Sequence, residues 1–162
     1  MFERTAHEQP RAIAIEVPPA AGGPALESLT YGEVLALAEA LSLRLAALVA
    51  GECVVAIALP RDSAAIYVAQ LAVLQAGAAY TCFDPGLERE RVRFLLADSG
   101  AVAVIAREAD RERFEALGVA RDRIITTDGN AQVARGAPSA NGLPHAPAPV
   151  PSSLAYVIYT SG

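Results

Sequence analysis

Short apolar runs alternate with helix-like segments through the middle of this chain, and this alternation constrains the fold more than any other feature. The expected strands are residues 53–59, 79–83, 101–106 and 123–127, and residues 53–59 form a continuous apolar run. A continuous apolar run of this length is typical of a strand that helices cover on both faces. Strands that alternate with helices build a mainly parallel sheet. We therefore expect an α/β fold in which helices flank one mainly parallel sheet.

The helices are predicted from their caps and from apolar residues at helical spacing. The expected helices are residues 2–9, a helix that starts at Thr30 and stops by Gly51, a helix from Asp62 or Ser63 to Ala76, and residues 88–98 and 110–117. Thr30 and Glu33 match a capping box, in which each side chain satisfies a free backbone donor of the first turn. The helix after Thr30 carries one apolar stripe, formed by Val34, Leu37, Leu41, Leu45 and Leu48.

The two ends of the chain differ from the middle. Residues 12–17 form an apolar run that the Pro- and Gly-rich residues 18–24 can return as a hairpin onto residues 27–29. Near the other end, residues 129–151 hold five prolines and three glycines without apolar periodicity, which predicts a loop. Regular structure is expected to resume as a strand at residues 154–159.

Composition supports one folded domain and argues against several function classes. The 162 residues are 53% hydrophobic and 19% charged, which suits a domain with a core rather than a disordered chain. All 13 basic residues are arginines. Those between Arg89 and Arg123 alternate with acidic residues, which is typical of a solvated helix surface, so we expect no nucleic-acid binding. His7 and His145 have no partners at metal-ligand spacing, so we assign them no metal site.

Residues 63–83 carry no charge over 21 positions, which is long enough to cross a bilayer. Their alanines, their two glutamines and the break at Gly77 fit a buried helix followed by a strand better, so we expect no membrane span. The first residues lack the basic segment and apolar stretch of a secretory signal, which favours a cytoplasmic protein. Cys53 and Cys82 lie in apolar runs and are expected to be small buried side chains rather than half-cystines.

The last residues carry the clearest chemical signal. Residues 154–162 read L-A-Y-V-I-Y-T-S-G, an apolar strand that runs into a turn of small residues. Small residues let backbone N–H groups approach phosphate oxygens closely, and hydroxyl groups add further donors. The T-S-G motif alone is a weak signal, because many strands end in an ordinary turn of this composition.

Residues 154–162 resemble the opening of the phosphate-loop motif of the adenylate-forming superfamily. Two upstream stretches are similar to core motifs of that superfamily in the same order, L-T-Y-G-E-V-L-A-L at residues 29–37 and L-Q-A-G-A-A-Y-T-C-F-D-P at residues 74–85. Residues 91–101 look like the helix and turn after the second motif. The resemblance covers nearly the whole chain and is greater to the amino-acid adenylation domains of nonribosomal peptide synthetases than to acyl-CoA ligases. Gln75 and Cys82-Phe83 depart from the usual Lys and Pro-Leu, which loosens the assignment to that subfamily.

This resemblance implies that residues 1–162 are the N-terminal portion of an adenylation domain. Such a domain uses ATP and Mg²⁺ to convert an amino acid or other carboxylate to an acyl-adenylate, and then loads the phosphopantetheine arm of a carrier protein. Of the ATP-binding residues, the resemblance places only Thr160, Ser161 and Gly162 in this chain, at the start of the phosphate loop. It places no catalytic residue and no metal ligand here, and so implies that the chain alone is inactive.

Two alternatives stay open at this point. The chain could be a fragment of an acyl- or aryl-CoA ligase of the same superfamily, or a non-catalytic α/β nucleotide-binding or interaction module. Sequence beyond Gly162 separates them, because a continued phosphate loop with a Lys supports an enzyme. A carrier-protein domain further along would favour the peptide synthetase over the CoA ligase.

We predict that limited proteolysis cuts first within residues 129–151. This stretch offers no periodic apolar face, so we expect its backbone to be the most mobile internal part of the chain. Mass spectrometry of the first fragments, at low protease concentration, locates the cuts. First cuts between Cys53 and Ala106 would contradict the expected α/β domain.

Overall fold

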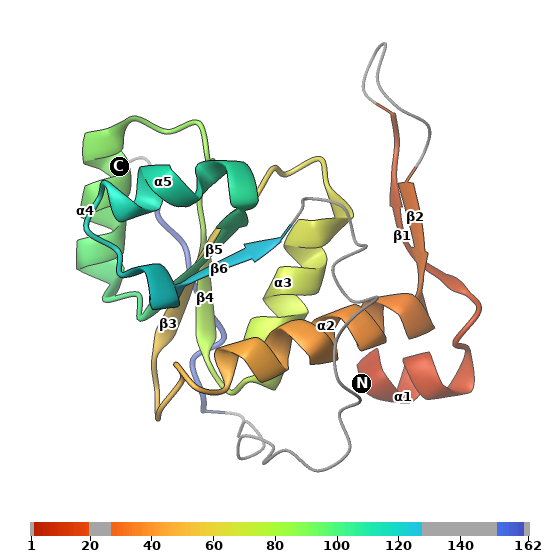
Figure 1. Ribbon diagram of the computed structural model, residues 1–162. Coiled ribbons are helices and arrows are strands. Elements are labelled where there is room, and N and C mark those ends of the chain that lie inside the picture. The colour runs from red at the N-terminus through yellow and green to blue at the C-terminus, as the bar shows by residue number, and fades with distance from the viewer. Residues whose placement is uncertain (1, 20–26, 128–151, 161–162) are drawn as a thin grey trace.

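The computed structural model describes residues 2–19, 27–127 and 152–160. It contains a five-stranded sheet in the order β6-β5-β3-β4-β7, and every neighbouring pair is parallel (Figure 1). The strands are β3 (Val54–Ala58), β4 (Ala79–Cys82), β5 (Ala103–Arg107), β6 (Ile124–Thr127) and β7 (Tyr156–Val157). The predicted α/β fold with a mainly parallel sheet is therefore confirmed.

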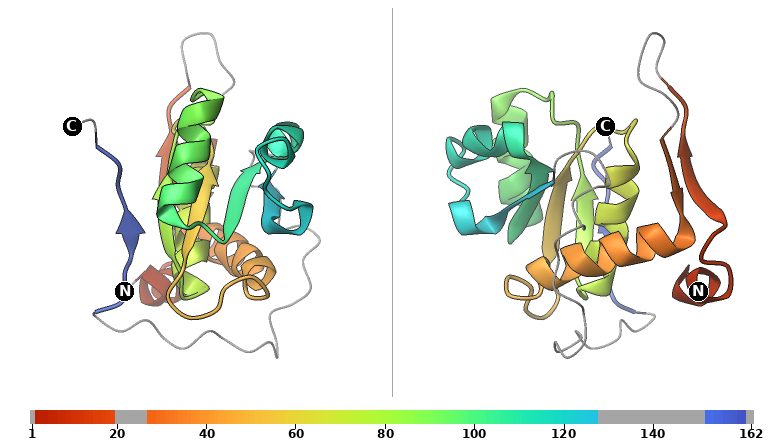
Figure 2. Two further views of the ribbon diagram at one scale, coloured as in Figure 1. Left: turned by 90° about the vertical axis from the view of Figure 1, so that its left-hand side faces the viewer. Right: turned by 45° about the vertical axis from the view of Figure 1, so that its right-hand side comes forward.

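Helices cover both faces of this sheet, as the apolar strands require (Figures 1 and 2). The helices are α2 (Tyr31–Leu45) and α3 (Ala64–Gln75) on one face and α4 (Arg89–Ser99) and α5 (Arg111–Glu115) on the other. Val55 and Ile57 of β3 belong to the same apolar cluster as α2 and α3. Ala56 and Ala58, which alternate with them, belong to the cluster of α4 and α5. The sheet thus has a separate core on each side.

The N-terminal residues form a smaller unit beside α2. Helix α1 (Phe2–Glu8) precedes an antiparallel pair of β1 (Ile13–Val17) and β2 (Glu27–Thr30), so the predicted hairpin is confirmed. Most of its turn, residues 20–26, lies outside the described residues. The predicted loop at residues 129–151 also lies outside them.

Capping residues set the helix starts as the sequence predicts. The Thr30 hydroxyl accepts a hydrogen bond from the Glu33 backbone N–H at 3.3 Å, and the Glu33 carboxylate accepts one from the Thr30 N–H at 2.8 Å. At α3, Ser63 rather than Asp62 is the cap, with its hydroxyl accepting from the Ala65 N–H at 3.2 Å. The prediction for the end of α2 is wrong. The helix stops at Leu45, well before Gly51, because the Leu45 carbonyl accepts from two later N–H groups and closes a turn.

Three further expectations are corrected by tertiary contacts. The helix expected at residues 110–117 is a 3₁₀ turn (Glu108–Asp110) followed by the short α5. The strand expected at residues 154–159 pairs only at Tyr156 and Val157, because β4 is its single neighbour among the described residues and offers few positions. Cys82 is exposed rather than buried, because it ends β4 at the rim of the sheet, whereas Cys53 is half-buried and both are free thiols.

Five of the eight arginines from Arg89 to Arg123 are exposed, as the expected solvated surface requires, whereas Arg107, Arg111 and Arg113 are half-buried. The Arg113 guanidinium donates hydrogen bonds to the backbone carbonyls of Pro85 and Leu87, which ties α5 to the segment before α4. Phe114, on the next position, is fully buried against Phe83 with a ring-centroid distance of 6.4 Å. No helix among the described residues has both the length and the apolar character needed to cross a membrane.

We predict that Thr30→Ala lowers the free energy of unfolding by about 1 kcal/mol, because the mutation removes the hydroxyl that caps α2. Thr30→Ser keeps a capping hydroxyl and serves as the matched control. Urea denaturation followed by circular dichroism measures both. Equal midpoints for Thr30→Ala and the parent chain would show that the cap does not stabilise the domain.

Candidate functional site

Strand β7 leads to Thr160, the first of the three residues that the sequence motif predicts as phosphate ligands, at one edge of the sheet. Thr160 lies three positions after the last paired residue, Val157, and is exposed to solvent. Because all strands of the sheet are parallel, their carboxyl ends meet at the same edge, which is where α/β folds bind ligands. Ser161 and Gly162 lie outside the described residues. The structure thus describes one of the three predicted site residues, Thr160, and it lies at the carboxyl edge of the sheet.

The start of β7 is held against β4 by backbone and ring contacts. The Tyr80 N–H donates to the Ala155 carbonyl at 3.1 Å, and Tyr80 and Thr81 pair with Tyr156 and Val157. The rings of Tyr80 and Tyr156 stack with their centroids 5.8 Å apart. Burial raises the pKa of the Tyr80 phenol, and the nearby Cys82 and Tyr156 raise it further. These contacts fix β7 as an edge strand, which Figure 2 shows at the border of the molecule.

Beyond the sheet, Tyr159 turns back toward α4. Its hydroxyl donates to the Asp98 carboxylate at 2.8 Å, and its ring meets the Phe94 ring edge-on at a centroid distance of 6.5 Å. The sequence motif did not identify these partners, since Asp98 is 61 positions away in the chain. The alternation of side chains along β7 leaves Leu154, Tyr156 and Ile158 exposed on the other side.

The turns of the upstream motifs act as scaffold at the described residues. The Asp84 carboxylate accepts from the Gly86 N–H at 2.7 Å, which closes the turn after β4. Gly77 adopts a positive φ of 81° between α3 and β4, a conformation that glycine adopts without strain. Across the described part of the chain, no group of three His, Cys, Asp or Glu side chains could hold a metal ion.

At the other end of the same edge, a charged network joins β6 to the helices. The Arg111 guanidinium donates to both oxygens of Glu108 at 2.7 and 2.9 Å and to the Thr126 hydroxyl at 2.8 Å. The Arg44 guanidinium donates to the Thr126 carbonyl at 3.0 Å, which connects α2 to the network. Hydrogen bonds from Arg111 and then from Thr126 lower the pKa of Glu108 to about 2. The network stabilises the packing of β6 against the helices, because its charged groups pair with one another.

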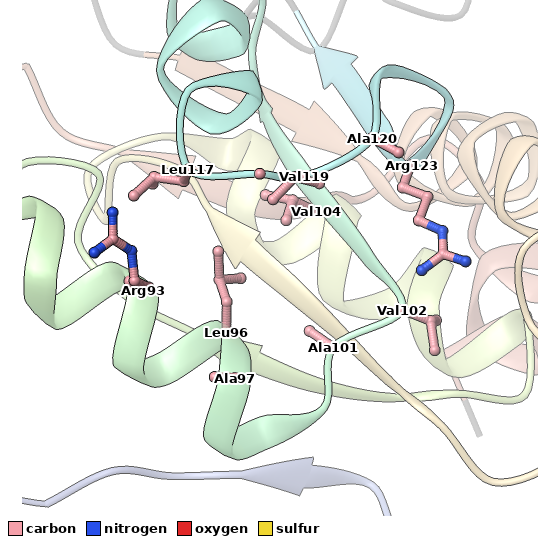
Figure 3. A pocket seen from close by; sticks show the side chains of 11 residues that line it. Arg93, Leu96, Ala97, Ala101, Val102, Val104, Leu117, Val119, Ala120 and Arg123 are labelled. Atoms are coloured by element: carbon pink, nitrogen blue, oxygen red, sulfur yellow. The ribbon is translucent and has the colours of Figure 1, made fainter.

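A cavity of 320 Å³ lies away from this edge, between α4 and the segment that leads into β6 (Figure 3). Its walls are partly polar, with the apolar side chains of Leu96, Val104 and Val119 between those of Arg93 and Arg123. Ala101 and Val102, which lead into β5, and Ala120 and Arg123, which precede β6, also line it. The cavity therefore opens near the amino ends of these strands, at the edge opposite to Thr160.

The described geometry agrees with what comparisons with known proteins show. The family model of AMP-binding enzymes matches residues 2–162 of this chain. The chain therefore belongs to the AMP-binding enzyme family, as its motifs predict.

Within this family, the chain is similar to nonribosomal peptide synthetases. It is 35% identical over 161 residues to chondramide synthase of Chondromyces crocatus and 36% identical over 165 residues to surfactin synthase subunit 2 of Bacillus subtilis. These matches cover 99% and 100% of this chain but only 4% of each synthase. The nonribosomal peptide synthetase FmoA3, in a form bound to α-methyl-L-serine-AMP, matches the structure with a TM-score of 0.75 and 26% identity. That match covers 98% of this chain and 16% of FmoA3.

We predict that Glu108→Gln flattens the acid dependence of stability. The folded-state pKa of Glu108 is lowered from 4.5 to about 2, so its contribution is complete above about pH 4.5 and is lost as the pH falls to about 2. The parent chain should therefore lose stability across this window more steeply than the variant. Urea midpoints at a series of pH values measure the slope.

Glu112→Gln is the matched control, because it removes an exposed carboxylate of the same region that makes no side-chain hydrogen bond among the described contacts. Identical slopes for Glu108→Gln and Glu112→Gln would contradict the lowered pKa of Glu108.

Proposed function

We propose that residues 1–162 form the N-terminal portion of an amino-acid adenylation domain of a nonribosomal peptide synthetase. The observation that carries the proposal is the match to FmoA3, which covers 98% of this chain at 26% identity and whose structure holds an aminoacyl-AMP. Peptide synthetases of two bacteria also match essentially the full chain. No observation favours the acyl-CoA ligase or the non-catalytic module over this assignment.

The proposed reaction has two steps, in which pyrophosphate leaves first and AMP leaves second. A carboxylate oxygen of the amino acid attacks the α-phosphorus of ATP, a new O–P bond forms, and the bond to pyrophosphate breaks. A phosphopantetheine thiol of a carrier protein then attacks the acyl carbon, loses its proton to solvent or a base, and displaces AMP. The proposed partners are therefore an amino acid and a carrier protein, and the proposed location is the cytoplasm.

The residues at the end of β7 fit the first step as phosphate ligands. Thr160 is small, exposed and carries a hydroxyl donor, and it lies at the carboxyl edge of the parallel sheet. Its hydroxyl and the backbone N–H groups of Thr160, Ser161 and Gly162 would hold the charge of the ATP phosphates, as small-residue turns do elsewhere. ATP would supply the adenylyl group when bound, and Mg²⁺ is its expected counter-ion. The described residues offer no Mg²⁺ ligand cluster, so we assign none.

We predict that this 162-residue chain does not exchange pyrophosphate into ATP, whereas the full-length product of its gene does so with an amino acid. Stabilising the charge of a transferring phosphoryl group needs donors on several sides, and this chain contains no lysine to meet the phosphates. ATP–pyrophosphate exchange with pooled amino acids measures both polypeptides.

A pool of fatty and aryl acids with coenzyme A is the control that separates the CoA-ligase alternative. Activity only with that pool would replace the proposed substrate class. A full-length product with a Lys-containing phosphate loop and no exchange with either pool would refute adenylation, and exchange by the 162-residue chain would refute its expected inactivity.

A further inference from the structure

Pairing with β4 holds the chain only as far as Val157, yet the phosphate-binding segment begins at Thr160. Strand β7 has two paired residues and a single neighbour among the described strands. A two-residue ladder on one side leaves the direction of the following residues weakly defined, because few hydrogen bonds oppose rotation of the backbone. Some other contact must orient the chain between Val157 and Thr160.

Tyr159 supplies such a contact, immediately before Thr160. Its hydroxyl donates to the Asp98 carboxylate at 2.8 Å, so the acceptor is charged. Hydrogen bonds to an ionised acceptor are stronger and more directional than those between neutral groups. Tyr159 is half-buried and packs against the core cluster of α4 and α5. The side chain therefore connects the chain next to the phosphate segment with a packed part of the domain.

The partner surface on α4 is a stripe that the core does not use. Arg91, Phe94 and Asp98 are three and then four positions apart, so they share one face of the helix. Phe94 is 49% exposed, but its ring meets the edge of the Tyr159 ring, and the Arg91 guanidinium lies 5.3 Å from the Phe94 centroid. Contacts with Tyr159 and Arg91 therefore explain why the aromatic Phe94 lies on the surface of α4.

Helix α4 is a rigid platform for these contacts. The adjacent face of the helix buries Val92 and Leu95 against the sheet, with 0% and 3% exposure. Gly100 ends the helix with a left-handed φ of 60°, which turns the chain directly into β5. A side chain that binds to α4 is thus fixed relative to the sheet whose edge forms the site.

We propose that Arg91, Phe94, Asp98 and Tyr159, which we call the α4 latch, orient the start of the phosphate-binding segment so that Thr160 faces ATP. This role rests on the proposed adenylation function. Tyr159 and Asp98 are positioning residues, because they act through the backbone of Thr160. The latch thereby sets the ATP affinity of the site.

Two variants test the latch with the least change in shape. Tyr159→Phe removes the donor hydroxyl and keeps the ring against Phe94. Asp98→Asn removes the charge of the acceptor and keeps its size. The matched controls are Tyr67→Phe and Asp122→Asn, which change an exposed tyrosine and an exposed aspartate that make no side-chain hydrogen bond among the described contacts.

The first measurement tests the contact itself in the 162-residue chain, without catalysis. Burial raises the pKa of the Tyr159 phenol, and the hydrogen bond and charge of Asp98 raise it further. Carbon-13 NMR of ring-labelled tyrosine should therefore show a lower Tyr159 pKa in Asp98→Asn than in the parent or in Asp122→Asn. An unchanged pKa in Asp98→Asn would overturn the latch.

The second measurement tests the role, by ATP–pyrophosphate exchange in the full-length gene product. Misplacing a binding segment by about 1 Å can cost on the order of 100-fold in rate, so removal of one latch hydrogen bond should raise the KM for ATP about tenfold. The KM for the amino acid should stay within about twofold, because the latch acts only on the segment proposed to bind ATP. The double variant should be no worse than either single one, because both remove the same hydrogen bond.

The outcomes separate the latch from the proposed function and from a structural role. A merely structural role lowers the amount of active enzyme, so kcat would fall while both KM values stay unchanged, and this result would overturn the latch. An ATP KM equal to that of the controls would overturn it as well. A parent protein that shows no exchange with any amino acid would instead refute the proposed function, and the role of the latch with it.

Discussion

Strand β3 has no side that faces water, and the rest of the domain is arranged around that constraint. Every residue from Val54 to Ala58 is buried, and the strand has β4 on one side and β5 on the other. Side chains that alternate along it enter two different apolar clusters. Such a strand is stable only if helices cover both faces, because each exposed apolar face would cost free energy. The positions of α2 and α3, and of α4 and α5, follow from this requirement.

The same parallel arrangement decides where chemistry can take place. Each crossover returns the chain to the same end of the sheet, so the loops after the strands gather at one edge. Thr160 follows β7 to this edge, next to the loop that holds Asp84. The cavity between Arg93 and Arg123 lies toward the opposite edge and plays no part in this arrangement. The fold thus separates the candidate phosphate site from this cavity beside α4.

Some arginines of this chain hold elements of the fold together, which their distribution along the sequence does not indicate. Arg111 grips both oxygens of Glu108, and Arg113 reaches two backbone carbonyls between β4 and α4. A guanidinium suits such tasks because it presents several donors in a fixed plane and stays charged. Mixed charge along helical segments predicted only a solvated surface, since a sequence pattern does not reveal carbonyl groups that lie across a turn. These arginines hold the loops around the edge of the sheet in place.

By itself, the sequence determined the elements whose causes are local and the family that their order indicates. The capping box of α2 is one example, because Thr30 and Glu33 are three positions apart and satisfy each other. The apolar runs determined the buried strands in the same way, since each run must leave water. Tertiary structure alone decided the contacts between distant residues, such as the early end of β7, the exposure of Cys82 and the pairing of Tyr159 with Asp98. The physical reason is that these outcomes depend on which residue lies across the sheet or on α4. Asp98 and Tyr159 are 61 positions apart, so their contact depends on the packing of the whole domain.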